Sequence, residues 1–532
     1  MSMHETGAPT GAELTLDVLR DEGVRHLFGN PGTTELPLVQ QVARQHDISY
    51  VLALQEASAV AMADGYARIT GRPAVANLHA AAGLGNSIGA LTNAAAARVP
   101  MVVTAGQQDL RHLIHAPVLA GDLTALTAGT VKWAHQVSTR EELGEVLRHA
   151  FRVAAAPPTG PVFVSLPMNL LDAPGPAAPP RSPVLRAAAA PIQEPAELLS
   201  QAPPGSIALV YGDELARHAP AEGQALAEAL NAPVWAAGWP ATNPLPTTHP
   251  LWRGYLPTHV TGIRDTLAPY RTVLLVGAHP FPLYYPYSPG PPLASDTTVV
   301  QITSDPTGPG RDTPVTCSVV GHLRPTLEAL LDTLPAAAAT ADTVPTSWPA
   351  SPTPGTLDSA EWARTVARNL PDGALVVDEA PQATRHLRTA LRLEQANLYQ
   401  WVSGGLGWAM PAAVGAALTR PGPVLCTLGD GAAMYSPQAL WTAAHLGLPI
   451  GYLIANNREY RVLKDNWRHR DNQARSYLGM DLTDPPLDFT ALARAMGVPA
   501  QQVTTPDGLA DAIHHGYRTG GPFLVDAVVA SS

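Results

Sequence analysis

A chain of 532 residues is longer than one hydrophobic core usually supports, so its length predicts two to four domains. Apolar residues make up 46% of the chain and charged residues 14%, which excludes a disordered composition. The 33 basic and 44 acidic residues give a net charge of −11 without a basic cluster. This balance argues against nucleic acid or an anionic membrane surface as a partner and favours a small neutral or anionic metabolite.

Targeting and redox signals are weak in this sequence. Residues 1–23 contain no basic head followed by an apolar stretch, and no later segment reaches the uncharged length of a membrane helix. Cys317 and Cys426 lie inside apolar runs, which predicts reduced core thiols rather than a disulfide. We therefore expect a soluble cytoplasmic protein with no membrane partner.

Two connectors divide the chain into three blocks. They are residues 172–191 and 335–355, which are poor in charge and rich in Pro and Ala, as is typical of extended linkers. The blocks alternate short β-rich runs with helical stretches. This pattern predicts three doubly wound, parallel-sheet α/β domains, at residues 1–175, 190–335 and 355–532.

The expected strands are short apolar runs without polar alternation, as in buried parallel sheets. In the first block they are PAVANLH, PMVVTAG and PVFVSLP, with a helix at ASAVAMADGYARIT. In the middle block they are SIALVYG, TVLLVGA and TTVVQIT, and in the last GALVVDE, PVLCTLG, IGYLIAN and PFLVDAVV. The middle block has no convincing glycine fingerprint, so neither FAD nor NAD is expected there.

A ligand-binding site is indicated at the end of the strand-like run PVLCTLG. The strand is expected to end at Asp430, between Gly429 and Gly431, with a helix a few residues later. The next strand brings Asn456 and Asn457 to the same sheet edge, where α/β folds bind ligands. Carboxylate and amide oxygens there suit Mg²⁺ or Ca²⁺ bridging to a diphosphate, while the glycines let amides approach the anion. GDG alone also fits a tight turn with an Asp cap, but its pairing with the two asparagines is more specific.

GDG followed by NN is the signature of thiamine diphosphate-dependent enzymes, and the sequence resembles that family over nearly its whole length. The resemblance implies a pyrimidine-binding, a middle and a diphosphate-binding domain. The segments most similar to the benzoylformate decarboxylase branch are FGNPGTTELPL (28–38), LALQEASAVAMADGYAR (52–68), NLHAAAGLGNSIGAL (77–91), VTAGQQ (103–108) and GGLGWAMPAAVG (404–415).

The resemblance also implies where the cofactor and the metal lie. Glu56 is expected to bond the aminopyrimidine ring and relay the proton lost from the thiazolium. Without the resemblance, Glu56 would be interpreted as an ordinary glutamate in the first turn of a helix. Leu406, otherwise a core residue, matches the apolar side chain that supports the bent cofactor. The implied metal ligands are the side chains of Asp430 and Asn457 and the backbone carbonyl of Glu459, and the other implied cofactor contacts are Asn30, Pro31, Gly32, Gly405, Gly429, Gly431, Ala432 and Tyr460.

The implied reaction is non-oxidative decarboxylation of a 2-oxo acid, through an ylide and an enamine, with release of an aldehyde. His79 matches an active-site histidine suited to proton transfer, although a lone histidine is more often structural. Thr33 stands where the family has a serine that contacts the substrate carboxylate. In this family two subunits hold one cofactor, so a homodimer is implied at least, and a homotetramer is expected.

The sequence departs from the family pattern at positions that are expected to contact the substrate. Tyr285 or Tyr284 takes the place of a second catalytic histidine, while His279 aligns only with an insertion. A tyrosine is a poor proton relay because its pKa lies near 10, and slow protonation favours carboligation with an aldehyde or ketone acceptor, as in acetolactate synthase-like enzymes. The expected pocket is more polar than one built for a phenyl group and consists of Pro117, Val118, Leu119, Gln400, Trp401, Leu463 and Asn466.

Two further interpretations stay open. The charged segment 464–475 fits a solvated helix face better than a substrate-binding element. A non-catalytic subunit that retains the fold is the third functional hypothesis. The intact Glu56, Asp430 and Asn457 count against it.

Overall fold

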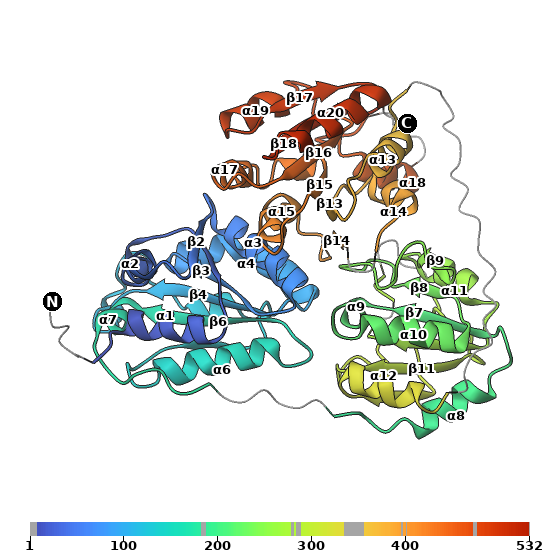
Figure 1. Ribbon diagram of the computed structural model, residues 1–532, viewed down its shortest axis with the longest axis horizontal. Helices are drawn as coiled ribbons and strands as arrows, with labels where there is room; N and C mark the ends of the chain where they lie inside the picture. The colour runs from blue at the N-terminus through green and yellow to red at the C-terminus, as the bar shows by residue number, and fades with distance from the viewer. Residues whose placement is uncertain are drawn as a thin grey trace.

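The protein is built from three sheets. The computed structural model describes residues 8–181, 188–277, 281–283, 289–334, 356–394, 397–400, 402–471 and 476–530. In this part of the chain there are three parallel sheets of six strands, each with helices packed against both faces (Figure 1). The predicted class of three doubly wound parallel-sheet domains is confirmed.

The first sheet has the strand order β2-β1-β3-β4-β6-β5. The winding reverses between β1 and β3, and open α/β sheets bind ligands at the carboxyl ends of strands at such a point. Its strands are β1 His26–Gly29, β2 Ser49–Leu52, β3 Ala74–Leu78, β4 Met101–Gln107, β5 Ala134–Gln136 and β6 Pro161–Pro167. Its helices are α1 Gly11–Asp21, the 3₁₀ turn η1 Thr33–Glu35, α2 Leu36–Gln45, α3 Glu56–Thr70, α4 Ala80–Ala96, η2 Leu113–His115, α5 Leu123–Leu126, α6 Leu143–Ala155 and α7 Met168–Asp172.

The middle sheet has the order β12-β11-β10-β7-β8-β9. Its strands are β7 Ile207–Tyr211, β8 Val234–Ala236, β9 Trp252–Tyr255, β10 Thr272–Val276, β11 Thr298–Thr303 and β12 Cys317–Val320. Its helices are α8 Gln193–Gln201, α9 Asp213–His218, α10 Pro220–Leu230, α11 Val260–Leu267 and α12 Leu323–Leu331.

The third sheet has the order β14-β13-β15-β16-β18-β17, and its winding reverses between β13 and β15. Its strands are β13 Leu375–Glu379, β14 Leu398–Gln400, β15 Val424–Gly429, β16 Ile450–Asn456, β17 Ala500–Val503 and β18 Phe523–Val528. Its helices are α13 Ser359–Arg368, α14 Thr384–Ala390, α15 Ala409–Ala417, α16 Asp430–Ala433, α17 Ala439–His445, α18 Arg461–Arg470, α19 Phe489–Ala495 and α20 Pro506–Arg518.

Local sequence explains these elements. Every residue of β4 and of β6 is buried, because helices cover both faces, so neither strand alternates with polar residues. Helix α1 begins with a capping box in which Thr10 and Glu13 bond each other's backbone amides through their side chains. The runs predicted as strands form β3, β4, β6, β7, β10, β11, β13, β15, β16 and β18.

The first and third domains of one chain meet where α3 crosses α15 (Figure 1). A Cβ at Gly65 of α3 would overlap with the carbonyl of Ala412, and a Cβ at Gly415 of α15 would overlap with the carbonyl of Met62. The two helix backbones therefore touch directly. This crossing lies close to the carboxyl edges of both sheets, since α3 begins and α15 follows just after residues implied in cofactor binding.

Two structural observations bear on the redox and membrane expectations. Cys317 and Cys426 are buried and form no disulfide. Within the described ranges no helix combines the length and the apolar character needed to cross a membrane.

Candidate active site

Three predicted residues meet at the carboxyl edge of the first sheet. Thr33 follows β1 and is exposed at the start of η1, and Glu56 follows β2 as the first residue of α3. His79 follows β3 as the residue before α4. Because β1 pairs with both β2 and β3, these three loops are neighbours. The structure thus brings the predicted catalytic residues of this domain to one edge.

Glu56 is only partly buried. The Gln55 side chain caps α3 by accepting a hydrogen bond from the Ser58 amide at 3.1 Å. The Glu56 carboxylate accepts a hydrogen bond from Nδ2 of Asn86 at 3.1 Å and lies against Gly83, both on α4. A carboxylate fixed on one side and open on the other is available to a ligand placed over this edge.

His79 has a partner that sequence reasoning missed. Its Nδ1 lies 2.9 Å from Oε2 of Glu35, the last residue of η1. The Glu35 side chain is 1% exposed and that of His79 is 22% exposed. The imidazole is therefore held at Nδ1 by a buried carboxylate and remains partly exposed.

Predicted apolar pocket residues lie beside the first turn of α4. The carbonyl of Leu119 accepts a hydrogen bond from the Ala81 amide at 3.4 Å. The carbonyl of Val118 accepts one from Nε2 of Gln108 at 3.0 Å, and the Val118 side chain is exposed. The loop that contains Pro117 is thus held two residues from His79.

Asp430 stands at the carboxyl edge of the third sheet, as predicted. Strand β15 ends at Gly429, and Asp430 begins an additional short helix, α16, while the helix expected a few residues later is α17. The extended conformation of Gly429 allows this immediate turn into α16. Oδ1 of Asp430 accepts a hydrogen bond from the Gly431 amide at 2.8 Å.

The second carboxylate oxygen of Asp430 has no hydrogen-bond partner in the part of the chain that the structure describes. Oδ2 is buried without a hydrogen bond among the described residues, and burial raises the pKa of this carboxyl to about 6. A buried polar oxygen without a partner is unfavourable unless a ligand or a cation satisfies it. Asp430 therefore fits a metal ligand.

The two asparagines after β16 have different surroundings. Nδ2 of Asn456 donates to Asp526 at 2.8 Å and its Oδ1 accepts the Arg458 amide at 3.1 Å, so this side chain is used internally. Oδ1 of Asn457 accepts only the Glu459 amide, at 3.1 Å, within the described contacts. The carbonyl of Glu459 accepts the Arg461 amide at 2.9 Å, and a carbonyl oxygen retains a second lone pair.

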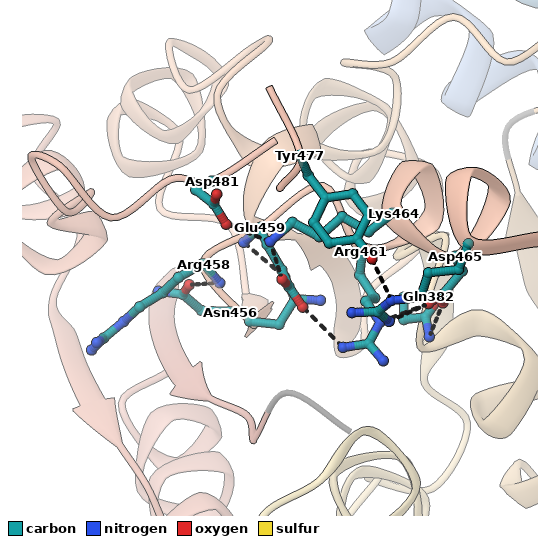
Figure 2. A network of polar contacts seen from close by, with 11 residues as sticks. Gln382, Asn456, Arg458, Glu459, Arg461, Lys464, Asp465, Tyr477 and Asp481 are labelled. Carbon is teal, nitrogen blue, oxygen red and sulfur yellow. Dashed lines mark hydrogen bonds and ion pairs between the residues drawn. The ribbon is translucent and has the colours of Figure 1, made fainter. Parts of the chain in front are cut away.

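The side chain of Glu459 is turned toward α18 (Figure 2). Its carboxylate lies 3.1 Å from Arg461 and 2.5 Å from Lys464, and Lys464 also pairs with Asp481. Arg461 in turn reaches Asp465 at 2.9 Å. The start of the charged segment 464–475 is therefore an ion-pair network on a helix. In this arrangement the backbone of Glu459, rather than its carboxylate, is left for a ligand.

The donor set matches an oxygen-only cation site. In the described ranges no three His, Cys, Asp or Glu side chains gather in a group that could hold a metal ion. Asp430, Asn457 and the Glu459 carbonyl offer a carboxylate, an amide oxygen and a backbone oxygen, as Mg²⁺ and Ca²⁺ prefer. Beside them, Gly431 has no side chain because a Cβ there would overlap with the ring of Tyr460. These residues fit a cation and the anion it would bridge.

The turn that contains Gly405 and Leu406 is held from two sides. Nδ2 of Asn93, in α4 of the first domain, donates to the Gly405 carbonyl at 2.7 Å. The Glu379 carboxylate at the end of β13 accepts the amides of Gly407 and Ala409, both at 2.7 Å. Burial raises the pKa of Glu379 to about 8. Leu406, half-buried, is thus presented by a fixed turn.

The other residues predicted to line the substrate pocket differ in how far they are buried. Gln400 is fully buried in β14, where its amide donates to Asp378 at 2.9 Å and accepts from Arg388 at 2.6 Å. Leu463 on α18 is 48% exposed, and Asn466 is partly exposed on the same helix. The other predicted residues of the substrate site, Trp401, Tyr284, Tyr285 and His279, lie outside the described residues.

Family models match all three domains. The model described as thiamine pyrophosphate enzyme, N-terminal TPP binding domain, matches residues 9–123. The model of the central domain matches residues 192–330, and that of the C-terminal TPP binding domain matches residues 382–527. These matches agree in order and position with the three sheets.

Individual proteins are similar to the chain over nearly its full length. It is 34% identical to benzoylformate decarboxylase of Pseudomonas aeruginosa, over 96% of this chain and 97% of the relative. It is 26% identical to the acetolactate synthase large subunit of Haemophilus influenzae, over 94% of this chain and 91% of the relative. Among solved structures, the thiamine diphosphate-dependent 4-hydroxybenzoylformate decarboxylase of Rhodococcus jostii RHA1 has a TM-score of 0.91 at 33% identity, covering 98% of this chain and 100% of its own. The benzoylformate decarboxylase of Polynucleobacter necessarius has a TM-score of 0.90 at 31% identity, covering 98% of each chain.

Proposed function

Because the chain belongs to the thiamine pyrophosphate enzyme family, we propose that it uses thiamine diphosphate and Mg²⁺, or Ca²⁺, to decarboxylate a small 2-oxo acid and release an aldehyde. The observation that carries the proposal is the buried, unpartnered Oδ2 of Asp430 at the edge where a diphosphate-bound cation would lie. The names of the similar decarboxylases support a 2-oxo acid as the substrate class.

The cofactor would supply an electron sink for cleavage of the bond to the carboxylate. Residues of the third domain would hold it: Asp430, Asn457 and the Glu459 carbonyl through the cation, and Gly429, Gly431, Ala432 and Tyr460 at the diphosphate. The turn with Gly405 and Leu406 would support its bent form. On the first domain, Glu56 would exchange a proton with the aminopyrimidine ring, beside Asn30, Pro31 and Gly32.

The substrate would lie over the edge of the first sheet. Thr33 is exposed, and its hydroxyl would donate a hydrogen bond to the carboxylate of the acid. His79 would exchange a proton with the substrate. The loop of Pro117, Val118 and Leu119 would form one wall. Leu463 and Asn466 on α18 would form a second wall, and an amide in that wall favours a substrate more polar than a phenyl compound.

In this proposal a second copy of the chain would complete the site. Glu56 is bonded within the first domain and Asp430 within the third, and apolar side chains are exposed near each. They include Tyr435, which is 59% exposed just after α16, and Leu54 and Leu463. If these side chains formed a contiguous patch, that patch would be a candidate association surface. We propose a homodimer in which each site takes its two halves from different subunits. We further propose that two such dimers form a homotetramer.

Carboligation is the second candidate. The similarity to an acetolactate synthase large subunit over 94% of this chain favours it. In that case an aldehyde or ketone would capture the product before it is released. The predicted Tyr285 would favour this outcome.

The test is an assay of purified protein with thiamine diphosphate, Mg²⁺ and a panel of aromatic, aliphatic and polar 2-oxo acids. Release of CO₂ is followed with and without an aldehyde acceptor, and Glu56→Gln is the matched inactive control. We expect release without acceptor on one class of acid. Release of CO₂ only when the acceptor is present would show a carboligase instead of a decarboxylase. If the cofactor-loaded protein released CO₂ from none of the acids, both proposed activities would be contradicted.

A further inference from the structure

The buried Glu35 and the partly exposed His79 form a pair that the proposed reaction has not yet used. The two residues are 44 apart in the sequence but follow the neighbouring strands β1 and β3, in which Gly29 pairs with Asn77. Their loops leave the sheet at the same edge. Oε2 of Glu35 and Nδ1 of His79 are 2.9 Å apart, within the range of a charge-assisted hydrogen bond.

The donors around Glu35 determine which atom of this pair carries the proton. Oε1 accepts the amide of Gly106 at 2.9 Å and the hydroxyl of Thr34 at 2.5 Å, and Oε2 accepts the amide of Gly32 at 3.1 Å. Backbone amides can only donate. The carboxylate is therefore surrounded by donors, and the group facing it from His79 is a donor as well.

Thr34 leads to the same assignment. Its hydroxyl lies 3.3 Å from Nδ1 of His79 and already gives its proton to Glu35, so toward the ring it can only accept. Both oxygen atoms near Nδ1 are acceptors. A neutral imidazole in this place has its hydrogen on Nδ1 and its lone pair on Nε2.

Packing keeps the ring in this orientation. A Cβ on Gly32 would overlap with the His79 ring at Nδ1, and a Cβ on Gly106 would overlap with Oε1 of Glu35. The two glycines thus let the backbone close around the pair. The ring cannot exchange its two nitrogen atoms without leaving this contact.

We propose that Glu35 is a positioning residue, which fixes the tautomer of His79 so that Nε2 faces the substrate and exchanges a proton there. This inference rests on the proposed function. One proton is taken up for each CO₂ that a 2-oxo acid loses on its way to an aldehyde. A proton bound at Nε2 makes an imidazolium whose charge Glu35 balances, and its transfer to the product restores the neutral ring.

The experiment measures ring protonation and turnover separately. Sedimented protein labelled with ¹⁵N-histidine is studied by solid-state NMR, and the signal of His79 among the 18 histidines is assigned by its loss in His79→Gln. In the unaltered protein, at a pH at which the ring is neutral, we expect a protonated Nδ1 and a bare Nε2. If the spectrum showed the opposite tautomer, the proposal would be overturned, and no variant of Glu35 would be needed for that conclusion.

Glu35→Gln is the decisive variant, because an amide keeps the volume but replaces one acceptor oxygen by a donor. We expect a changed ring signal and a kcat lower by on the order of 10²-fold, the lower range of what a general acid–base group contributes. KM should change by less than about threefold, since transition-state rather than ground-state interactions are lost.

Glu13→Gln is the matched control in the same domain, since a capping box accepts either side chain, and it should alter neither readout. If Glu35→Gln retains both kcat and the ring signal while the unaltered protein turns over a 2-oxo acid, the positioning role is wrong and the proposed function stands. If the unaltered protein turns over no 2-oxo acid, the proposed function fails, and the tautomer is still determined.

Discussion

Oδ1 of Asp64 accepts a hydrogen bond from Nε1 of Trp408 at 2.9 Å, across 344 residues of sequence. The same oxygen lies 2.5 Å from Nε of Arg68, whose guanidinium stacks over the Trp408 ring at 4.4 Å. Arg68 also donates to the carbonyl of Gln400 at 2.6 Å. A buried ion pair therefore joins the first and third domains of each chain.

Arg68→Met should destabilise the protein strongly, because it leaves the Asp64 carboxylate buried without its counter-charge. Breaking such a pair removes about 3–5 kcal/mol. Trp408→Phe removes one hydrogen bond and leaves the ion pair, so its effect should be smaller, about 1–3 kcal/mol. Thermal midpoints of both variants are compared, with the exposed Arg72→Met as control. Equal losses in the two variants would contradict this account of the junction.

Glu56→Gln should bind thiamine diphosphate but lose most activity, because an amide cannot exchange a proton with the aminopyrimidine ring. We expect a fall in turnover of about 10²–10⁴-fold, with cofactor affinity little changed. Calorimetric titration with the cofactor and CO₂ release measure the two quantities. Full activity in this variant would remove Glu56 from the site.

Asp430→Ala should abolish Mg²⁺-dependent retention of the cofactor, because it deletes the unpartnered oxygen proposed to bind the cation. The same change should leave the melting temperature of the cofactor-free protein unchanged or higher, since it removes a buried carboxylate oxygen without a partner. Retention is measured by gel filtration followed by cofactor assay, with and without a chelator.

Asp372→Ala is the control for this experiment, since Asp372 is exposed before β13, at the opposite edge of the same sheet. It should retain the cofactor as the unaltered protein does. Loss of retention in both variants would indicate a general effect of charge rather than a site at Asp430.

His218 at the end of α9 should make the protein sensitive to acid. Burial, followed by the nearby charges of Arg217, Arg324 and His322, lowers the pKa of His218 to about 4 from an ordinary value of 6.5. The unfolded chain therefore binds more protons than the folded one between these values. The resulting contribution to stability is complete above pH 6.5 and is lost as the pH falls toward 4.

The free energy of unfolding should fall by at most about 1.4 kcal/mol per pH unit through this histidine alone. His218→Gln should flatten the acid side of a plot of melting temperature against pH. His514→Gln, on the exposed face of α20, is the control and should leave the slope unchanged. An unaltered slope in His218→Gln would assign the acid sensitivity elsewhere.

Interior strands were predictable where helices cover both faces of the sheet, because this burial requires continuous apolar runs such as those of β4 and β15. The interior strands β1 and β8 were not predicted, since they are only four and three residues long. Edge strands were not predicted. The strand β17 carries Gln501 and Gln502, both exposed, and β5 has three half-buried residues. Strands so short and polar lack the apolar run by which strands are recognised.

The edge proposed to bind a cation could be identified as a candidate from the sequence, because its residues are close in sequence and chemically distinctive. Glu35 was not, since an acid in a first helical turn is ordinary and its partner His79 comes from another strand. For Gln400, the sequence could not show that β13 and β14 pair, which places its amide between Asp378 and Arg388. A substrate could reach this amide only by breaking these bonds.

The crossing of α3 and α15 limits how the chain can be recombined. Each helix contributes a glycine that lies against the backbone of the other, and the ion pair of Asp64 and Arg68 is completed by Trp408 just before α15. A chimera that took the first domain from one relative and the third from another would have to inherit both helices from the same parent. Residues 56–70 and 404–417 thus form one heritable unit, although more than three hundred residues of chain separate them.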